Sequence, residues 1–298
     1  MRRLHLAAYL SLCLIWGSTW LAIRVCVFHV PPFLAAALRF LIGAAALLVW
    51  AALRRSRRPE TTQQWNAILV LGFTTISIPY GLLFWAEQYV TSSLSAVLYS
   101  ALPLTVALLT PLMLRRSVPR QAVFSMVIAF GGLLVLFTDL QFGTRAFWAG
   151  IAVFLSMFCG AWSAVYAKRR LDHVDPIVST ALQLLVGSLG LFWCTWALEP
   201  HQHGSWTRSA VLSLLFLGTF GSAAAFAIYY WLLQRMQPYR LSTINLIIPI
   251  VAVLEGALLG REAIPPVMIV AMVVVLGSVG VVLWAESAQE EKQHSISA

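Results

Sequence analysis

The sequence contains few charged residues for its length. Asp, Glu, Lys and Arg make up 10% of its 298 residues, whereas soluble domains carry roughly 25%. Hydrophobic residues account for 60%, and the mean hydropathy is +0.83. So little charge excludes an ordinary soluble domain and predicts a polytopic membrane protein.

The sequence also lacks the short motifs of common enzymes. It has no GxxxxGKS or GxxxxGKT, no HExxH and no GxSxG, which excludes a typical ATP-driven pump and a soluble-type hydrolase. Its four cysteines stand singly, with no CxxC and no histidine at ligand spacing, so we expect no metal, no cofactor and no disulfide. We predict that the protein is not an enzyme. A membrane-embedded enzyme that uses Glu87 and Glu255 is a remote alternative.

Ten apolar runs reach the length of about 20 residues that a membrane-spanning helix needs. Their approximate bounds are 6–27, 32–53, 66–88, 92–114, 120–138, 147–167, 176–197, 209–233, 240–260 and 265–285. The connections are short and contain proline or arginine, so no soluble domain is inserted. The predicted fold class is therefore all-α, with ten transmembrane helices in the lipid bilayer. The polar tail at 287–298 is expected to be disordered.

Basic residues give the chain a net charge of +9, and they gather in the loops of one side. If the N-terminus is cytoplasmic, 15 of the Lys and Arg residues fall on the inner side and 4 on the outer side. The inner loops of membrane proteins carry such an excess. We therefore predict a multi-pass protein of the bacterial inner membrane, with both termini cytoplasmic and no nucleic acid as a partner.

The two halves of the chain match each other at an offset of 144 to 146 residues. The matched pairs include Pro32 and Pro176, Gly43 and Gly187, Gly72 and Gly218, Trp85 and Trp231, Pro103 and Pro249, Pro119 and Pro265, and Gly131 and Gly277. Each half holds five spans, and because five is odd, the second half must enter the membrane from the opposite side. We therefore predict two inverted five-helix repeats, 1–141 and 142–286, an arrangement found in many secondary transporters.

Several short motifs resemble the EamA family of the drug/metabolite transporter (DMT) superfamily. In the first half they are IWGSTW at 15–20, the Arg39-Phe40 pair, and the stretch 85–103 with Trp85, Tyr89, Ser93, Tyr99 and Pro103. In the second half they are the stretch 162–166, Pro249 and the turn Gly260-Arg261-Glu262. The resemblance covers residues 4–286. It implies a ten-helix carrier without ATP hydrolysis, and such carriers commonly export amino acids, related metabolites or toxic compounds.

The repeat and the resemblance together predict a secondary transporter that works by alternating access around a cavity near the membrane midplane. We expect export of small metabolites such as amino acids or amphipathic compounds. A passive facilitator or channel-like uniporter without ion coupling is the alternative, because the fold alone does not establish coupling. Proton coupling stays open, as does the choice between a monomer and a homodimer.

Tryptophan is usually found at membrane interfaces, yet Trp16 and Trp20 lie near the middle of the first run, on one helical face at i and i+4. They would wall an amphipathic substrate, with Ser18 and Thr19 as hydrogen-bonding groups. The alternative is that the small and hydroxyl residues of this run pack against a neighbouring helix.

Asn245 lies four residues before Pro249, whose missing N–H leaves a backbone carbonyl free to line a cavity. Tyrosine and tryptophan also occupy corresponding spans of both halves. Packing, interface anchoring and interhelical hydrogen bonding are the alternatives for these residues. The candidate substrate-binding residues are Trp16, Ser18, Thr19, Trp20, Tyr80, Tyr99, Trp162, Tyr166, Tyr230 and Asn245.

Three charged residues, Arg39, Glu87 and Glu255, fall in the outer half of their apolar runs, where an unpaired charge is costly. Their repeat partners are the uncharged Gln183, Leu233 and Leu109. We hypothesise that the three residues serve gating or coupling, either as an ion-pair network at the extracellular gate or as a protonatable site. The alternatives are a headgroup position for Glu87 and a purely structural pair for the other two.

These charges also bear on the substrate. Carboxylates in the outer half suit a cationic ligand, and Arg39 suits an anionic one. A zwitterion such as an amino acid satisfies both.

Overall fold

The apolar runs of the sequence form helices in the computed structural model, and the chain turns between them at the expected prolines and arginines. The structure describes residues 3–90, 95, 98–135, 144–171, 173–200, 204–260 and 266–297, and these contain no strand. The helices are α1 (Arg3–His29), α2 (Pro32–Leu53), α3 (Thr62–Leu71), the π-helical η1 (Gly72–Ser77), α4 (Ile78–Ala86), α6 (Leu102–Leu114), α7 (Arg120–Val135), α8 (Thr144–Arg170), α9 (Pro176–Leu198), α10 (Arg208–Gly218), the π-helical η2 (Thr219–Ala224), α11 (Ala225–Leu233), α12 (Pro238–Leu241), α13 (Ile244–Gly260) and α14 (Pro266–Ser297).

Seven of the described segments are long and apolar enough to cross a membrane. They are α1, α2, α3–η1–α4, α8, α9, α10–η2–α11 and the α12–α13 segment as far as Glu255. Leu102–Leu114 and Ile269–Trp284 are shorter apolar helices. The prediction of an all-α, polytopic membrane protein is confirmed.

Two of the predicted spans are not continuous helices. A turn at Ser100 and Ala101 precedes α6, and a turn at Ser242 and Thr243 separates α12 from α13. In the second turn, Ser242 Oγ donates to the carbonyl of Tyr239 at 2.8 Å, and Thr243 Oγ1 donates to a carbonyl at 2.6 Å. Side chains that bond to nearby backbone compete with the helix, which accounts for the interruption.

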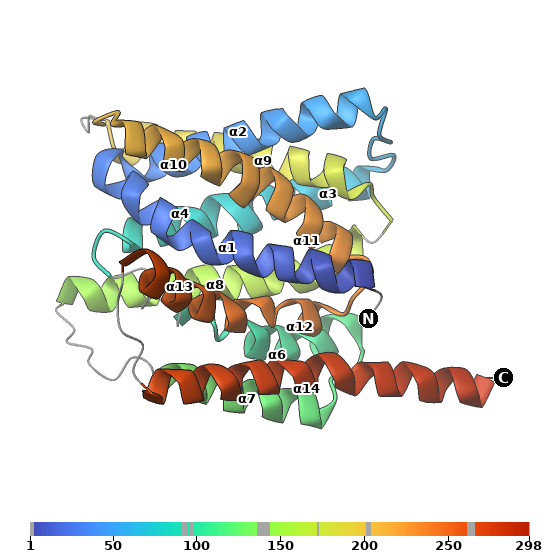
Figure 1. Cartoon of the computed structure of the whole chain (residues 1–298). Coiled ribbons are helices and arrows are strands. Elements are labelled where there is room, and N and C mark those ends of the chain that lie inside the picture. The colour runs from blue at the N-terminus through green and yellow to red at the C-terminus, as the bar shows by residue number, and fades with distance from the viewer. Residues whose placement is uncertain are drawn as a thin grey trace.

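The helices form a bundle with two distinct edges (Figure 1). The helices α2, α9 and α10 lie along one edge, and α7 pairs with α14 along the other. Between them, α1 packs against α13 and α10, and α8 packs against α4 and α6. Both termini lie at the same end of the bundle, which we call the terminal end; the opposite one is the distal end.

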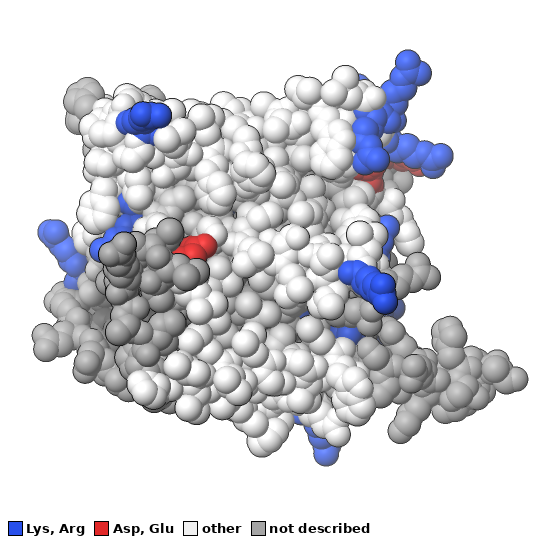
Figure 2. Space-filling view, in the orientation of Figure 1, with Lys and Arg blue, Asp and Glu red and all other residues white. Residues whose placement is uncertain are grey.

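Charged side chains on the visible face gather at these two ends (Figure 2). Figure 2 shows a broad uncharged band across the middle of the visible face, with Lys and Arg on either side of it. Exposed arginines of the terminal end include Arg54, Arg55, Arg57, Arg58 and Arg116. An uncharged belt between charged ends is what a protein that crosses a bilayer presents to lipid.

The two halves of the chain form the same close helix crossing. A β-carbon added to Gly187 in α9 would lie 2.9 Å from the carbonyl oxygen of Gly72, and one added to Gly43 in α2 would lie 3.1 Å from the carbonyl oxygen of Gly218. Both crossings adjoin a π-helical turn, η1 in one half and η2 in the other. These four glycines are two of the pairs that the offset in the sequence matched. The boundary predicted between the repeats, at 141 and 142, lies outside the described residues.

The C-terminal segment, for which the sequence predicts a disordered tail, is continuous with α14. The helix α14 continues through this polar segment as far as Ser297 and extends beyond the bundle (Figure 1). Seven of the twelve residues at 287–298 are Ala, Glu, Gln or Lys, which are strong helix formers. The helix propensity of these residues therefore favours continuation of α14, although the segment is polar.

Glu199 caps α2 from another helix. It is buried directly after α9, and its Oε1 and Oε2 accept hydrogen bonds from the backbone N–H groups of Phe33 at 3.0 Å and Leu34 at 3.2 Å. The residue before α2, Pro31, makes no side-chain cap. A carboxylate at a helix N-terminus satisfies unpaired amides and favours the helix dipole. Glu199 thus fixes the distal ends of α2 and α9 to each other.

Replacing Glu199 with alanine should lower the free energy of unfolding by about 1 kcal/mol, because two amides of the first turn lose their acceptor. Thermal unfolding of the purified protein in detergent measures the change. Glu60→Ala is the matched control, since Glu60 is an exposed acidic residue in a loop. Equal stability of the two variants would contradict the capping role.

The pH dependence of stability should change with the same residue. Burial raises the pKa of Glu199 above its ordinary value, and the two amide hydrogen bonds lower it by less. The folded chain therefore holds this proton more tightly than the unfolded chain. The stabilisation is complete below the unfolded pKa and is lost as pH rises through the folded pKa. Raising the pH should accordingly favour Glu199→Gln over the natural protein in thermal unfolding.

Candidate functional site

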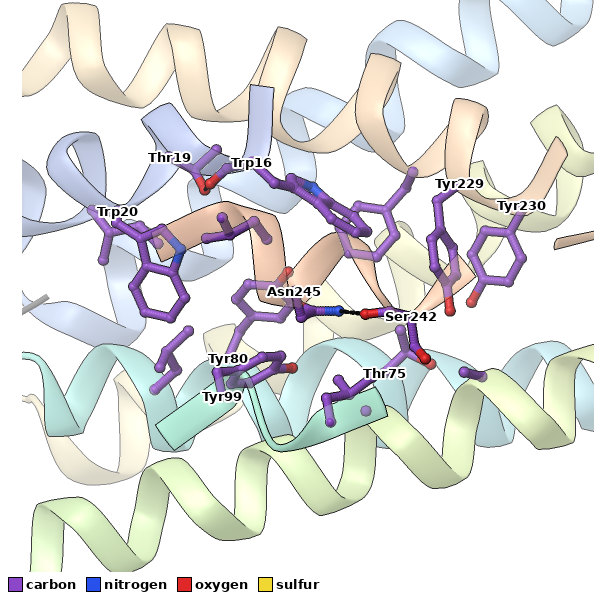
Figure 3. A pocket seen from close by; sticks show the side chains of 17 residues that line it. Trp16, Thr19, Trp20, Thr75, Tyr80, Tyr99, Tyr229, Tyr230, Ser242 and Asn245 are labelled. Carbon is purple, nitrogen blue, oxygen red and sulfur yellow. Dashed lines mark hydrogen bonds between the residues drawn. The ribbon is translucent and has the colours of Figure 1, made fainter. Parts of the chain in front are cut away.

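A cavity of about 90 Å³ lies inside the bundle, where helices of both halves meet (Figure 3). Trp16, which faces it, is the fourteenth of the 27 residues of α1 and so stands at the middle of that helix. The lining residues are Trp16, Thr19, Trp20, Ile23, Thr75, Tyr80, Leu83, Tyr99, Leu102, Gly160, Ala164, Phe226, Tyr229, Tyr230, Ser242, Asn245 and Ile248. A mainly apolar cavity with a few polar groups is the usual form of a small-molecule site.

One face of α1 forms a wall of this cavity. Trp16, Thr19, Trp20 and Ile23 follow the i, i+3, i+4, i+7 spacing that places residues on a single face. Trp16 Nε1 donates to the carbonyl of Gly221 in η2 at 3.4 Å, and Thr19 Oγ1 donates to the carbonyl of Trp16 at 2.7 Å. The indole of Trp16 is thus held in place from the opposite half of the chain.

Aromatic rings from several helices close around the cavity. The ring of Trp16 lies 5.5 Å from that of Phe226 and 5.4 Å from that of Tyr229, between centroids. Trp20 and Tyr99 lie 6.2 Å apart in an edge-on arrangement. Such spacings are typical of favourable aromatic pairs. The cavity therefore offers flat apolar surfaces with hydroxyl groups at their edges.

The interrupted helix contributes polar groups on another side. Asn245 Nδ2 donates to the carbonyl of Ser242 at 3.0 Å, and both residues line the cavity (Figure 3). Pro249 lies inside α13 and has no N–H to bond the carbonyl of Asn245. The turn between α12 and α13 thus places backbone and side-chain polar groups beside an apolar space, as discontinuous helices do in transporters.

Seven of the ten candidate substrate-binding residues line this one cavity: Trp16, Thr19, Trp20, Tyr80, Tyr99, Tyr230 and Asn245. Ser18, Trp162 and Tyr166 do not. Ser18 is two residues from Trp16, which corresponds to a rotation of about 200° around the helix. It hydrogen-bonds to Glu255 instead. Its hydroxyl joins two helices and does not face the cavity.

The other two exceptions belong to α8. Trp162 and Tyr166 stack on each other with centroids 4.7 Å apart and planes 14° apart. Gly160 and Ala164 line the cavity from this helix, again about 200° away. Trp162 and Tyr166 follow Trp16 and Trp20 by 146 residues and are therefore their repeat partners. The two halves nevertheless present different faces of the equivalent helix to the cavity.

Thr75, Phe226 and Ser242 line the cavity without having been predicted. Phe226 could have been found, because it follows Tyr80 by 146 residues and is therefore its repeat partner. Tyr230, beside it on α11, donates through its hydroxyl to Gln183 Oε1 at 2.6 Å. Nothing in the local sequence around Thr75 or Ser242 separates them from other hydroxyl residues of the spans.

Arg39 is fully buried where α2 crosses η2. Its Nε donates to Ser222 Oγ at 2.9 Å, and one terminal nitrogen donates to the carbonyl of Gly221 at 3.2 Å. The guanidinium lies 5.0 Å from the ring centroid of Phe40 and 5.1 Å from that of Tyr80. Its surroundings are therefore aromatic rings, one hydroxyl and one carbonyl.

The structure does not bring the three intramembrane charges together. Within the described residues, Arg39 forms no ion pair with Glu87 or Glu255. Glu87 is 4% exposed directly after α4, and Glu255 in α13 accepts a hydrogen bond from Ser18 in α1. Arg39 and Glu255 thus contact different elements, η2 and α1. The described residues likewise contain no group of three His, Cys, Asp or Glu side chains that could hold a metal ion.

Three residues of the motifs noted in the sequence, Ser93, Arg261 and Glu262, lie outside the described residues. The remaining motif residues are placed. Trp16, Thr19, Trp20 and Tyr99 among them line the cavity, and Arg39 lies at the crossing of α2 with η2.

Comparison with known proteins agrees with this architecture. Protein PagO of Salmonella typhimurium is 28% identical over 281 residues, which cover 93% of this chain and 92% of that protein. The inner membrane transporter YedA of Escherichia coli K12 is 26% identical, with 91% of this chain and 88% of that protein covered. The transporter YoaV of Bacillus subtilis is also 26% identical, with 86% and 88% covered.

A protein of known crystal structure superposes with a TM-score of 0.81 over 97% of this chain and 100% of the other. The sequence identity is 20%, so this similarity concerns the fold alone. The model of the EamA-like transporter family matches twice, at residues 4–138 and 147–284. Since the two matches span nearly the whole chain, one in each half, this protein belongs to the EamA-like transporter family.

Proposed function

We propose that the protein is a secondary transporter that moves small metabolites or amphipathic compounds by alternating access. The observation that carries this proposal is the aromatic cavity at the middle of α1, which receives residues from both halves of the chain. A midplane site between two related halves is where such carriers bind their substrate. The transporters among its relatives support the same function.

The terminal end of the bundle is tied together by hydrogen bonds between helices. Tyr9 in α1 and Thr243, beside α13, bond through their hydroxyls at 2.7 Å. After α11, Gln234 Nε2 donates to the backbone carbonyl of Val174 at 2.6 Å. The backbone carbonyl of Gln234 accepts from Lys168 Nζ at 2.9 Å. These contacts support a state in which the terminal end is closed.

The repeat partner of Gln234 is engaged differently. Gln88, at the distal end, is exposed, and its Nε2 donates at 3.2 Å to the carbonyl of Trp85 in the preceding turn. Gln234 bonds to the connection between α8 and α9, which corresponds by repeat to the connection between α1 and α2. We propose that Gln88 bonds to this second connection when the distal end closes, and that Gln234 then releases its own.

We propose that both termini are cytoplasmic and that the protein lies in the bacterial inner membrane, because the basic loops flank the terminal end. We propose export as the direction, since carriers of the family that the sequence resembles commonly export their substrates. Glu255 and Glu87 are proposed as gating or proton-coupling residues. The bond from Ser18 to Glu255 joins α1 to α13 in the distal half, and protonation would weaken it. An unchanged pH profile of transport in Glu255→Gln would remove the coupling role.

Counterflow in proteoliposomes tests the transport function. Vesicles loaded with an unlabelled panel of amino acids, organic anions and organic cations should accumulate the labelled form of at least one of them, with saturation. A carrier exchanges because the loaded protein changes state in both directions. The same measurement with and without a pH gradient reports proton coupling.

The controls are protein-free vesicles and vesicles that hold the Gly160→Leu variant, in which the cavity is filled. A flux that rises linearly with substrate concentration, without saturation, would indicate a channel or passive facilitator and contradict the carrier. Absence of flux for the whole panel in well-folded protein would count against transport through this cavity.

A further inference from the structure

We propose that the central cavity selects amphipathic organic anions, such as carboxylates with an apolar or aromatic body, over cations of the same shape. The proposal rests on the transport function proposed above and adds the charge class of its substrate. Three features carry it: a buried cation next to the cavity, the absence of acidic groups in the described lining, and hydrogen-bond donors of the lining that no group of the described chain engages.

Arg39 supplies the positive charge. It is 1% exposed, and no carboxylate of the described chain pairs with it. One of its terminal nitrogens, Nη1, has no hydrogen-bond partner in the described structure. A buried charge without a counter-ion is costly, and an anion brought close to it recovers part of that cost.

The guanidinium lies one side-chain layer behind the cavity wall. Tyr80, which lines the cavity, contacts it through the face of its ring at 5.1 Å. Trp16, which also lines the cavity, donates to the same carbonyl of Gly221 as Arg39 does. The material between the charge and the cavity is therefore two aromatic side chains and one peptide group, which screen a charge poorly.

No acidic group opposes this charge from the described lining. None of the described residues that line the cavity is Asp, Glu, Lys, Arg or His. The two carboxylates that the sequence predicted near the site are placed elsewhere: Glu255 contacts Ser18, which does not line the cavity, and Glu87 lies after α4. These two carboxylates therefore do not attract a cationic ligand into the cavity. Arg39, which lies next to the cavity, still attracts an anion.

The polar groups of the lining favour an acceptor-rich ligand. Within the described part of the chain, no hydrogen bond engages Trp20 Nε1 or the hydroxyls of Tyr80 and Tyr229. An indole N–H can only donate, and phenol hydroxyls donate readily to a carboxylate. Tyr80 comes from α4 and Tyr229 from α11, and both line the same cavity.

The expected preference follows from the distance and surroundings of the charge. At a separation of about 10 Å and an effective dielectric constant of about 20, the attraction between two opposite unit charges corresponds to about tenfold in the dissociation constant. An anion should therefore bind about tenfold more tightly than a neutral analogue, and a cation more weakly than either. Glutamine is a suitable uncharged replacement for Arg39, because the chain itself has a glutamine, Gln183, at the repeat-related position.

Four indole compounds that differ in charge test the proposal: indole-3-acetate, tryptophan, indole-3-ethanol and tryptamine. Dissociation constants are measured on the purified full-length protein, and the same compounds compete in counterflow. Indole-3-acetate should bind about tenfold more tightly than indole-3-ethanol, and tryptamine most weakly. Arg39→Gln should bring the anion to the affinity of the neutral compound, and Arg39→Lys should keep much of the preference.

Binding of indole-3-ethanol reports whether each variant still has an intact cavity. If Arg39→Gln does not fold, the ranking of the four compounds on the natural protein decides alone. Equal affinities for all four, or tighter binding of tryptamine, would overturn the charge selection and leave the transport function standing. Failure of all four to bind or compete, with exchange of some other panel compound, overturns selection of this class. Failure of every panel compound overturns the transport function as well.

Discussion

Gly187→Ala is expected to prevent most of the protein from reaching a stable fold. A β-carbon at this position would lie 2.3 Å from Cβ of Ile76 and 2.9 Å from the carbonyl oxygen of Gly72. Both neighbours belong to the backbone or the branch point of η1, so neither can turn away. Two helices would have to separate, which costs about 3 kcal/mol or more at a close-packed crossing. Monodisperse yield in detergent and the unfolding temperature measure the loss.

Gly277→Ala and Gly131→Ala are the matched controls. They place the same methyl group on helices α14 and α7, where no atom lies within 4 Å of the added carbon. Alanine is a better helix former than glycine, so these variants should be neutral or more stable by about 0.5–1 kcal/mol. A stable, well-folded Gly187→Ala variant would mean that α9 and η1 do not cross as closely as described.

Gly160→Leu is expected to abolish transport in a protein that still folds. Gly160 lines the cavity from α8, and a β-carbon there would lie 2.9 Å from the hydroxyl of Tyr99 and 3.4 Å from Leu102 Cδ1. A leucine side chain adds four carbons to a space of about 90 Å³. Overlap of a few atoms with a substrate costs more than about 1.4 kcal/mol, which corresponds to about tenfold in affinity. The rate of exchange should therefore fall at least about tenfold.

The control uses the same substitution in the same helix. A β-carbon at Gly150 would meet only Leu98 Cδ1, at 3.8 Å, and Gly150→Leu should therefore keep its transport rate. Counterflow at equal protein density measures both variants, and size-exclusion profiles report folding. Full transport activity in Gly160→Leu would place the substrate pathway elsewhere in the bundle.

The fold could be predicted from the sequence because lipid imposes simple rules. Runs of about 20 apolar residues must become helices, and prolines and arginines mark their ends. The interruption at Ser242 and Thr243 could not be predicted, because it depends on which hydroxyls bond to the backbone and not on hydropathy. Glu199 escaped prediction for a related reason, since its partners at Phe33 and Leu34 are distant in sequence.

The candidate site could be predicted in part. Aromatic and polar residues in the middle of spans indicated the cavity correctly on α1, where Trp16 and Trp20 share a face. The repeat misled the prediction on α8, since the equivalent Trp162 points away. The charges were predicted to meet because they lie at similar depth, but depth does not give the direction that a side chain takes around its helix. Only packing places Arg39 against Tyr80 and Glu255 against Ser18.

The proposed interchange of Gln88 and Gln234 would govern how the two states are populated. If equivalent hydrogen bonds close either end, forming one set offsets the loss of the other, and the two states differ little in free energy. Their balance then depends on positions where the halves differ, such as Arg39 and Gln183. A strongly biased equilibrium needs a ligand with about 10⁴-fold preference to reverse it. A nearly balanced carrier needs far less, so a weakly bound substrate suffices to turn it over.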